Sequence, residues 1–139
     1  MPVAIKRLSH ISMSTRDLLA TERFYVDLMG FKVAHEFHNA AGERYGFFLH
    51  CGGGTFIEFF QKKDAGREEG LFRHICYETD DIEAFAAKVR AYGIGDFTIK
   101  RGRTDKILQF FFNDPDGVQV EIQQHDDQSV LAPYARGER

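Results

Sequence analysis

Near its C-terminal end the chain reads Asn113-Asp114-Pro115-Asp116-Gly117-Val118-Gln119-Val120-Glu121-Ile122. Proline fixes its own φ and glycine accepts a positive φ, so Asp114-Pro115-Asp116-Gly117 predicts a tight turn. The turn makes 106–113 and 117–124 the two strands of an antiparallel hairpin. Because side chains alternate along a strand, Glu121 is expected to share one face with Gln119 and Gln123.

A strand of the same kind closes the first half of the chain. There the sequence is Gly54-Thr55-Phe56-Ile57-Glu58-Phe59-Phe60-Gln61, with a glutamate at the corresponding place. The two halves also open alike, with Leu8-Ser9-His10-Ile11 and Phe72-Arg73-His74-Ile75. His10 and His74 are 64 positions apart, and Glu58 and Glu121 are 63 apart. This spacing indicates an internal repeat.

The periodicity of each half predicts a β-α-β-β-β unit. In the first half a helix is expected from Leu18 to Met29, capped by Thr15 or Asp17 and ended by Gly30. In the second half a helix ends at Gly93, and its apolar residues Ile82, Phe85, Ala86 and Val89 have the spacing of one buried face. Strands are expected at 4–13, 31–37, 44–51, 54–61, 72–78, 96–100, 106–113 and 117–124.

We therefore expect a single domain made of two modules. The first module covers about residues 4–61 and the second about 72–124. The polar, glycine-containing segment 62–71 is interpreted as the linker, and 125–139 as a C-terminal tail.

Composition excludes several classes of partner. The formal net charge is −3, with 18 Lys and Arg against 21 Asp and Glu, which argues against binding to nucleic acid or to an anionic membrane. No segment is apolar enough to span a bilayer, and the N-terminus does not resemble a signal peptide. Cys51 and Cys76 are expected to be reduced, buried thiols. These features favour a cytoplasmic location.

The repeated residues suggest one metal site. Glu58 shares its strand face with Phe56 and Phe60, where a carboxylate is unfavourable unless it is paired or bound to a cation. His10 and His74 are placed mid-strand among apolar neighbours. A pseudo-twofold relation between the halves would bring both pairs together, and such nitrogen and oxygen donors suit Zn, Ni, Co, Mn or Fe(II).

Simpler interpretations of these residues stay open. A strand histidine is often a hydrogen-bonded core residue, a strand glutamate often faces solvent, and a duplication need not preserve a shared site. The other histidines have no counterpart at the repeat spacing and are interpreted as surface or packing residues; they are His35, His38, His50 and His125.

These motifs resemble the vicinal oxygen chelate superfamily, which includes the glyoxalase, bleomycin resistance and dioxygenase proteins. Most characteristic are Phe24-Tyr25-Val26-Asp27-Leu28-Met29-Gly30-Phe31 and the segment 113–122, and the resemblance covers about residues 4–124. It implies an α+β fold in which two tandem βαβββ modules form a cupped, mixed eight-stranded sheet around a metal site. A small sheet unit with open edges gains from association, so a homodimer is also expected.

The order His, Glu, His, Glu resembles bacterial glyoxalase I, lactoylglutathione lyase. That resemblance implies a metal-dependent lyase or isomerase that moves a proton between adjacent carbons of a small carbonyl adduct through an enediolate. One divalent metal would be held by His10, Glu58, His74 and Glu121. A metal-bound carboxylate, Glu121 or Glu58, would act as the base, with Glu121 preferred.

Other functions remain as alternatives, because the scaffold supports several chemistries. One is another enzyme of the superfamily, such as an epimerase, a dioxygenase or a thiol transferase of the fosfomycin-resistance type. The other is a non-catalytic, bleomycin-type binding protein, against which the presence of all four ligands argues.

The resemblance leaves the substrate open. Ser14 and Lys62 stand where glyoxalase I has an Arg and an Asn that hold glutathione, whereas Arg103 stands where it has a Lys. Glutathione is therefore one candidate cosubstrate, and a different carbonyl or hydroxy-acid substrate is another. The candidate substrate-binding residues are Arg101 and Arg103, as an anion handle, and Phe56 and Phe60 beside Glu58.

Overall fold

The computed structural model of the chain describes residues 3–66 and 70–137. The chain divides into two units, Met1–Gly66 and Arg67–Arg139. Their boundary falls inside the predicted linker 62–71, of which residues 67–69 lie outside the described residues. Each unit contains one mixed four-stranded sheet, so the eight strands are shared equally between two βαβββ modules, and the predicted α+β class is confirmed.

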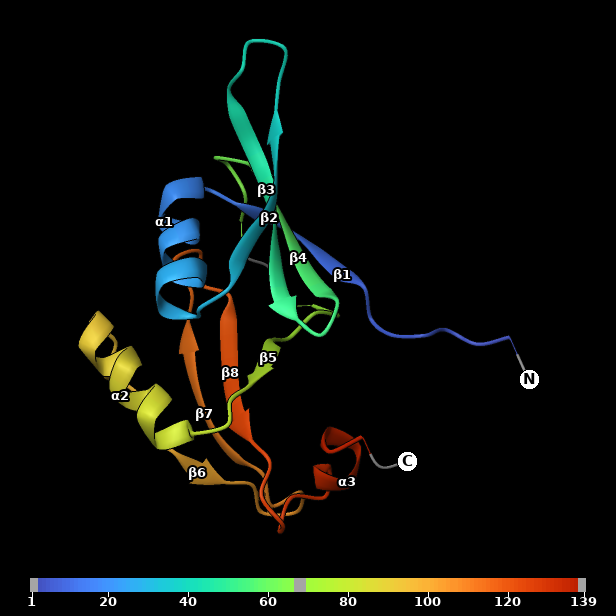
Figure 1. Cartoon of the computed structure of the whole chain (residues 1–139). Helices are drawn as coiled ribbons and strands as arrows, with labels where there is room; N and C mark the ends of the chain where they lie inside the picture. The colour runs from blue at the N-terminus through green and yellow to red at the C-terminus, as the bar shows by residue number, and fades with distance from the viewer. Residues whose placement is uncertain (1–2, 67–69, 138–139) are drawn as a thin grey trace. The chain divides into compact units, whose positions relative to one another are not determined.

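In the first unit the sheet has the strand order β1-β4-β3-β2. Strand β1 is parallel to β4, whereas β3 is antiparallel to both of its neighbours. Figure 1 shows the helical segment along one side of this sheet, where α1 packs on β4. The elements are β1 (His10–Thr15), α1 (Leu18–Glu22), the π-helix η1 (Arg23–Leu28), β2 (Lys32–His38), β3 (Arg44–Gly52) and β4 (Thr55–Gln61).

The predicted helix 18–29 forms, although its second half is a π-helix. Of the two candidate caps, the Asp17 carboxylate accepts the hydrogen bond from Ala20 N at 3.1 Å. The wider turn that follows still directs apolar side chains into the core: Phe24, Tyr25 and Leu28 are at most 1% exposed. They pack with Phe47, Leu49 and Phe59 from the helix-facing side of the sheet.

The second unit repeats this plan with the strand order β5-β8-β7-β6. Strand β5 is parallel to β8, and α2 packs on β8 along one side of the sheet (Figure 1). Asp81 caps α2 as Asp17 caps α1, and Gly93 ends it with a φ of 113°. The elements are β5 (Ile75–Glu78), α2 (Ile82–Tyr92), β6 (Lys100–Arg101), β7 (Leu108–Asn113), β8 (Gln119–Gln124) and α3 (Ala132–Ala135).

The hairpin predicted around Asp114-Pro115-Asp116-Gly117 is confirmed, with β7 antiparallel to β8. The Asp114 carboxylate accepts hydrogen bonds from the backbone N–H groups of Asp116 and Val118, both at 2.9 Å. Gly117 has a φ of 84°, as the turn requires. This turn sets the register that brings Phe111 opposite Glu121.

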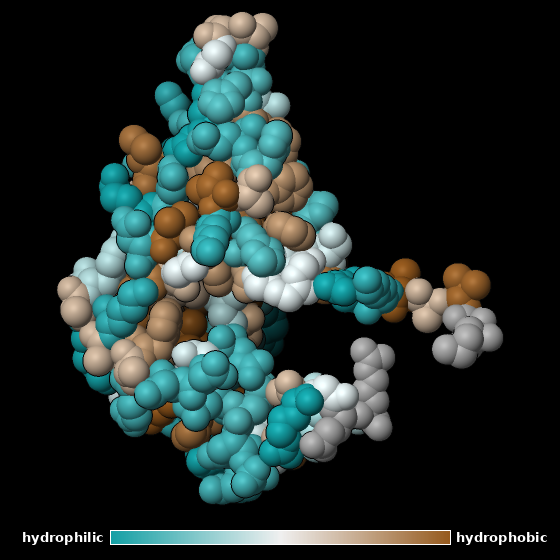
Figure 2. All heavy atoms as spheres, viewed as in Figure 1, coloured by the Kyte–Doolittle hydropathy of each residue, from teal (hydrophilic) through white to brown (hydrophobic). Residues whose placement is uncertain are grey.

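Three strand predictions were too long by three residues or more. Residues 4–9 are not in a strand, because their partner β4 begins only at Thr55, after a turn of three glycines, and His10 pairs with Phe56. Their apolar side chains are exposed, with Ile5 and Leu8 at 91% and 65%, and Figure 2 shows apolar atoms on this projecting segment. Residues 72–74 lie outside β5.

Residues 96–99 were also predicted as strand and are not. Phe97 instead stacks on Phe110 with ring centroids 4.5 Å apart, and the Arg90 guanidinium covers it at 4.7 Å. The short helix α3 in the tail was not expected. No helix among the described residues is long and apolar enough to cross a membrane.

Candidate metal centre

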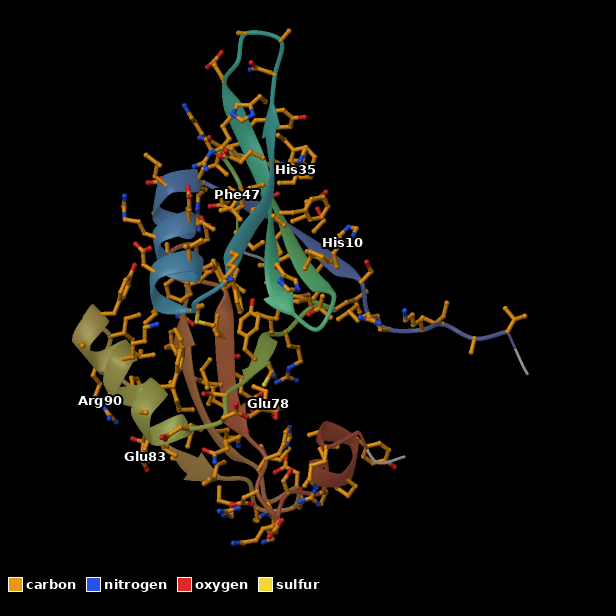
Figure 3. The ribbon with its side chains drawn as sticks, in the orientation of Figure 1. His10, His35, Phe47, Glu78, Glu83 and Arg90 are labelled. Carbon is orange, nitrogen blue, oxygen red and sulfur yellow. The ribbon has the colours of Figure 1, made fainter. Side chains whose placement is uncertain are left out.

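The first candidate ligand pair lies on β1 and β4, on the sheet face opposite α1. His10 pairs with Phe56 and Ser12 with Glu58, so His10 and Glu58 are diagonal neighbours on adjacent strands. Contrary to the mid-strand prediction, His10 is the first residue of β1 and is exposed, as Figure 3 shows. Glu58 is half-buried. Within the described residues the two side chains form no ion pair with each other.

The second candidate pair has the same placement in the second unit. Strand pairing places Ile75 opposite Val120 and Cys76 opposite Glu121. His74 is two residues before Cys76, just as His10 is two residues before Ser12, the residue opposite Glu58. His74 lies just before β5 rather than inside a strand. Its Nε2 is 3.0 Å from Oε1 of Glu121. Glu121 is only 8% exposed, although it carries a carboxylate.

Each pair also has an aromatic neighbour, which was not found from the sequence. Phe48 pairs across the sheet with Glu58, and Phe111 pairs with Glu121. The His10 ring meets Phe48 edge-on at 5.3 Å and 84°, and the His74 ring meets Phe111 at 5.6 Å and 90°. Phe48 and Phe111 are 63 positions apart, as the glutamates are, so the repeat spacing would have identified them.

The donor set fits a divalent cation. Metal–nitrogen and metal–oxygen bonds are about 2.0–2.2 Å long. Two ligand atoms are therefore about 2.9 Å apart when the ligand–metal–ligand angle is a right angle, and about 3.4 Å apart when it is tetrahedral. The 3.0 Å between His74 Nε2 and Glu121 Oε1 lies within this range. Among residues 3–66 and 70–137 no three His, Cys, Asp or Glu side chains gather as a metal site, so each unit offers two ligands.

Cys76 lies beside the second pair, and Ser12 holds the matching position in the first unit. Burial raises the pKa of the Cys76 thiol, and the negative charge of Glu121 and a hydrogen bond to it raise that pKa further. Burial also raises the pKa of Cys51, to about 11. Both cysteines are free, as predicted, but they are half-buried rather than fully buried.

The four candidate substrate-binding residues have different surroundings. Arg101 is held by Asp126 through two hydrogen bonds of 3.0 and 2.7 Å, and this contact lowers the pKa of Asp126 to about 2. Arg103, two residues later, is exposed. On the first sheet Phe56 and Phe60 are half-buried and flank Glu58. Phe60 lies directly over Gly46, where any side chain would collide with its ring.

The remaining histidines divide into two kinds. His35, His38 and His50 lie on β2 and β3, and the ring of His50 is 5.2 Å from that of Phe56 (His35 is labelled in Figure 3). His125 is fixed in the second unit by Gln123 at 3.0 Å and Ser129 at 2.7 Å. These contacts agree with surface and packing roles.

Known proteins share both the sequence pattern and the fold. The uncharacterized protein YaeR of Escherichia coli K12 is 27% identical over 125 residues, which cover 86% of this chain and 97% of YaeR. The crystal structure of a glyoxalase family protein from Enterococcus faecalis superposes with a TM-score of 0.74 at 27% identity, covering 85% of this chain and 97% of that chain. That of a lactoylglutathione lyase from Agrobacterium tumefaciens gives 0.61 at 20% identity, covering 88% and 94%.

The family is identified from a match over residues 7–122, which include strands of both βαβββ units and all four candidate ligands. This segment matches the pattern of one superfamily over most of the chain. The chain therefore belongs to the Glyoxalase/Bleomycin resistance protein/Dioxygenase superfamily.

Proposed function

We propose that the protein is a metal-dependent lyase or isomerase of the glyoxalase I type, acting on a small carbonyl adduct. The observation that carries the proposal is the duplicated pair: His10 with Glu58 and His74 with Glu121 occupy the same register positions in their sheets. Each pair has a phenylalanine opposite its glutamate and edge-on to its histidine. A repeat preserved for packing alone would not require a histidine and a carboxylate at both places.

In this proposal the two pairs together hold one divalent cation. When bound, the cation supplies a Lewis acid that stabilises negative charge developing on a substrate oxygen. The ligand type agrees with Ni, Zn, Co, Mn or Fe, because nitrogen and oxygen donors suit all of them. Glutathione is retained as one candidate cosubstrate.

The proton transfer is assigned to a carboxylate of the chain. Glu121 is the preferred base, with Glu58 as the alternative: a carboxylate oxygen takes the proton from one carbon and returns it to the adjacent carbon. Glu121 is shielded from bulk water, with a side-chain exposure of 10%, and His74 orients it. A shielded carboxylate can keep the proton it has taken until it returns it to substrate.

Substrate binding is proposed to involve residues from both units. Phe56 and Phe60 would contact the apolar part of the substrate beside Glu58, and exposed Arg103 would attract its negative charge. Arg101 is the weaker candidate, because Asp126 already occupies its guanidinium.

The first test is the metal content of protein purified without added metal, measured by elemental analysis. We expect about one divalent ion per chain in the wild type and a strong loss in His74→Ala and Glu121→Ala. The matched controls are His125→Ala and Glu83→Ala, which remove the same groups from the same unit away from the pair. Full metal retention in both ligand variants would contradict the site.

A small substrate panel then separates the candidate reactions. The metal-loaded protein is assayed with carbonyl compounds, with and without glutathione, and separately with a catechol and oxygen. Isomerisation of a carbonyl adduct with no catechol turnover supports the proposal. Catechol cleavage without isomerisation would instead identify a dioxygenase of the same superfamily.

The proposed homodimer is tested together with the origin of the ligands. Sedimentation gives the solution mass, and a monomer at micromolar concentration would reject the dimer. Two inactive variants are then mixed, one lacking His10 and Glu58 and the other lacking His74 and Glu121. Metal binding restored by mixing means that the two pairs come from different chains, whereas no restoration means that one chain supplies both.

A further inference from the structure

A cavity of about 300 Å³ lies in the second unit, lined by Gly70, Phe72, Arg73 and Gln119. Two of its lining residues are close in sequence to the pair formed by His74 and Glu121. Arg73 directly precedes His74, and Gln119 lies two residues before Glu121 on β8, so Gln119 and Glu121 share one face of that strand. None of the four lining residues was a candidate on sequence grounds.

The charge in this cavity is not balanced within the described part of the chain. Other arginines are paired there: Arg44 with Glu22 and Glu36, and Arg101 with Asp126. The guanidinium of Arg73 is exposed and has no hydrogen bond or ion pair with any residue in 3–66 or 70–137. Its five N–H donors, with the side-chain amide of Gln119, are therefore available to an anion.

We propose that this cavity binds the carboxylate or phosphate group of the substrate through Arg73 and Gln119. Phe72, which is 47% exposed, contacts the carbon atoms of the substrate next to that anionic group. The volume corresponds to about ten water molecules, enough for one anionic group with a short carbon chain. The inference rests on the proposed function in one respect: the anion is taken to belong to the molecule that reacts beside His74 and Glu121.

The site is tested by titrating sodium acetate and inorganic phosphate, separately, into the full-length protein as purified. Binding is followed by the side-chain NMR signals of Arg73 Nε–H and the Gln119 amide. We expect saturable binding that weakens at least about tenfold in Arg73→Gln, because a charge-assisted hydrogen bond is lost. Since a lysine has no bidentate fork, Arg73→Lys should keep phosphate binding better than acetate binding.

Two variants make the comparison specific. Lys88→Gln removes the same charge from the exposed surface of α2, and its affinities should stay within about twofold of the wild type. Arg103→Gln tests the other exposed arginine proposed to attract the substrate. Circular dichroism of each variant checks that the fold is retained. Replacing an exposed arginine is expected to leave the fold unchanged.

The inference is overturned if neither anion binds saturably, if Arg73→Gln binds both as the wild type does, or if only Arg103→Gln loses binding. Preferential binding of acetate identifies the carboxylate as the recognised group, and preferential binding of phosphate identifies a phosphoryl group. Metal content is measured on the same samples. A wild type without metal but with Arg73-dependent anion binding rejects the proposed function alone, so the two failures are distinguishable.

Discussion

Replacing Glu121 by Gln separates its two proposed roles, as a ligand and as a base. The side chain is almost fully buried, and Oε1 lies 3.0 Å from His74 Nε2. Glutamine has nearly the same shape and keeps an oxygen at this position, so the fold and one oxygen donor are retained. What the amide cannot do is accept the proton that the reaction removes from carbon.

The expected effect is large because a positioned general base contributes about 10²–10⁴ to the rate. This corresponds to about 3–5 kcal/mol in the activation free energy. Glu121→Gln should lose turnover by this factor when activity is divided by bound metal. Loss of a ligand alone would reduce metal content and activity in parallel and leave the turnover of each metal-bound molecule unchanged.

The assay is kcat measured at matched metal occupancy, with elemental analysis on the same samples. Glu58→Gln is the companion variant, since Glu58 has the same register position in the first unit. A loss confined to Glu121→Gln identifies Glu121 as the base, and a loss confined to Glu58→Gln transfers the role to Glu58. If both variants keep the turnover of the wild type per bound metal, neither carboxylate is the base, and the proton-transfer argument is refuted.

Three further predictions follow from packing and pKa shifts. Gly46→Ala should lower the free energy of unfolding by about 1–3 kcal/mol, because the new Cβ would lie 2.6 Å from a backbone oxygen. Denaturant unfolding measures this change. Gly95→Ala is the control, because its Cβ would meet no atom within 4 Å. Arg101→Gln should return the pKa of Asp126 from about 2 towards 3.8. Because the folded-state pKa is lowered, the stabilisation is present above about pH 4 and is lost as the pH falls through about 2; an unchanged carboxyl NMR titration would exclude the contact. Cys51, with a pKa of about 11, should be alkylated at pH 8 at least about tenfold more slowly in the native than in the unfolded chain, as mass spectrometry of its peptide can measure.

Most of the fold could be predicted from the sequence because its signals are local. The cap at Asp17, the glycine at 93 and the turn beginning at Asp114 each depend on residues within a few positions. The repeat added the equivalence of the two halves, which no single element carries. It placed the four candidate ligands at matching positions before any contact between strands was known.

The sequence was less informative where strand formation or a side-chain contact depends on a partner strand or on a residue distant in the chain. Residues 4–9 were predicted to begin a strand but have no partner strand, because β4 begins at Thr55. Arg101 was interpreted as an anion handle, yet Asp126, far along the chain, occupies it. Arg73 gave no signal at all, since its significance depends on the cavity it lines.

By itself, then, the sequence determined the duplicated βαβββ plan and the identity of the candidate ligands. Only the tertiary structure decided the register, which places each histidine diagonally to its glutamate and a phenylalanine opposite that glutamate. The reason is physical: strand periodicity specifies which face a side chain takes, whereas pairing between strands remote in sequence specifies which side chains meet on that face.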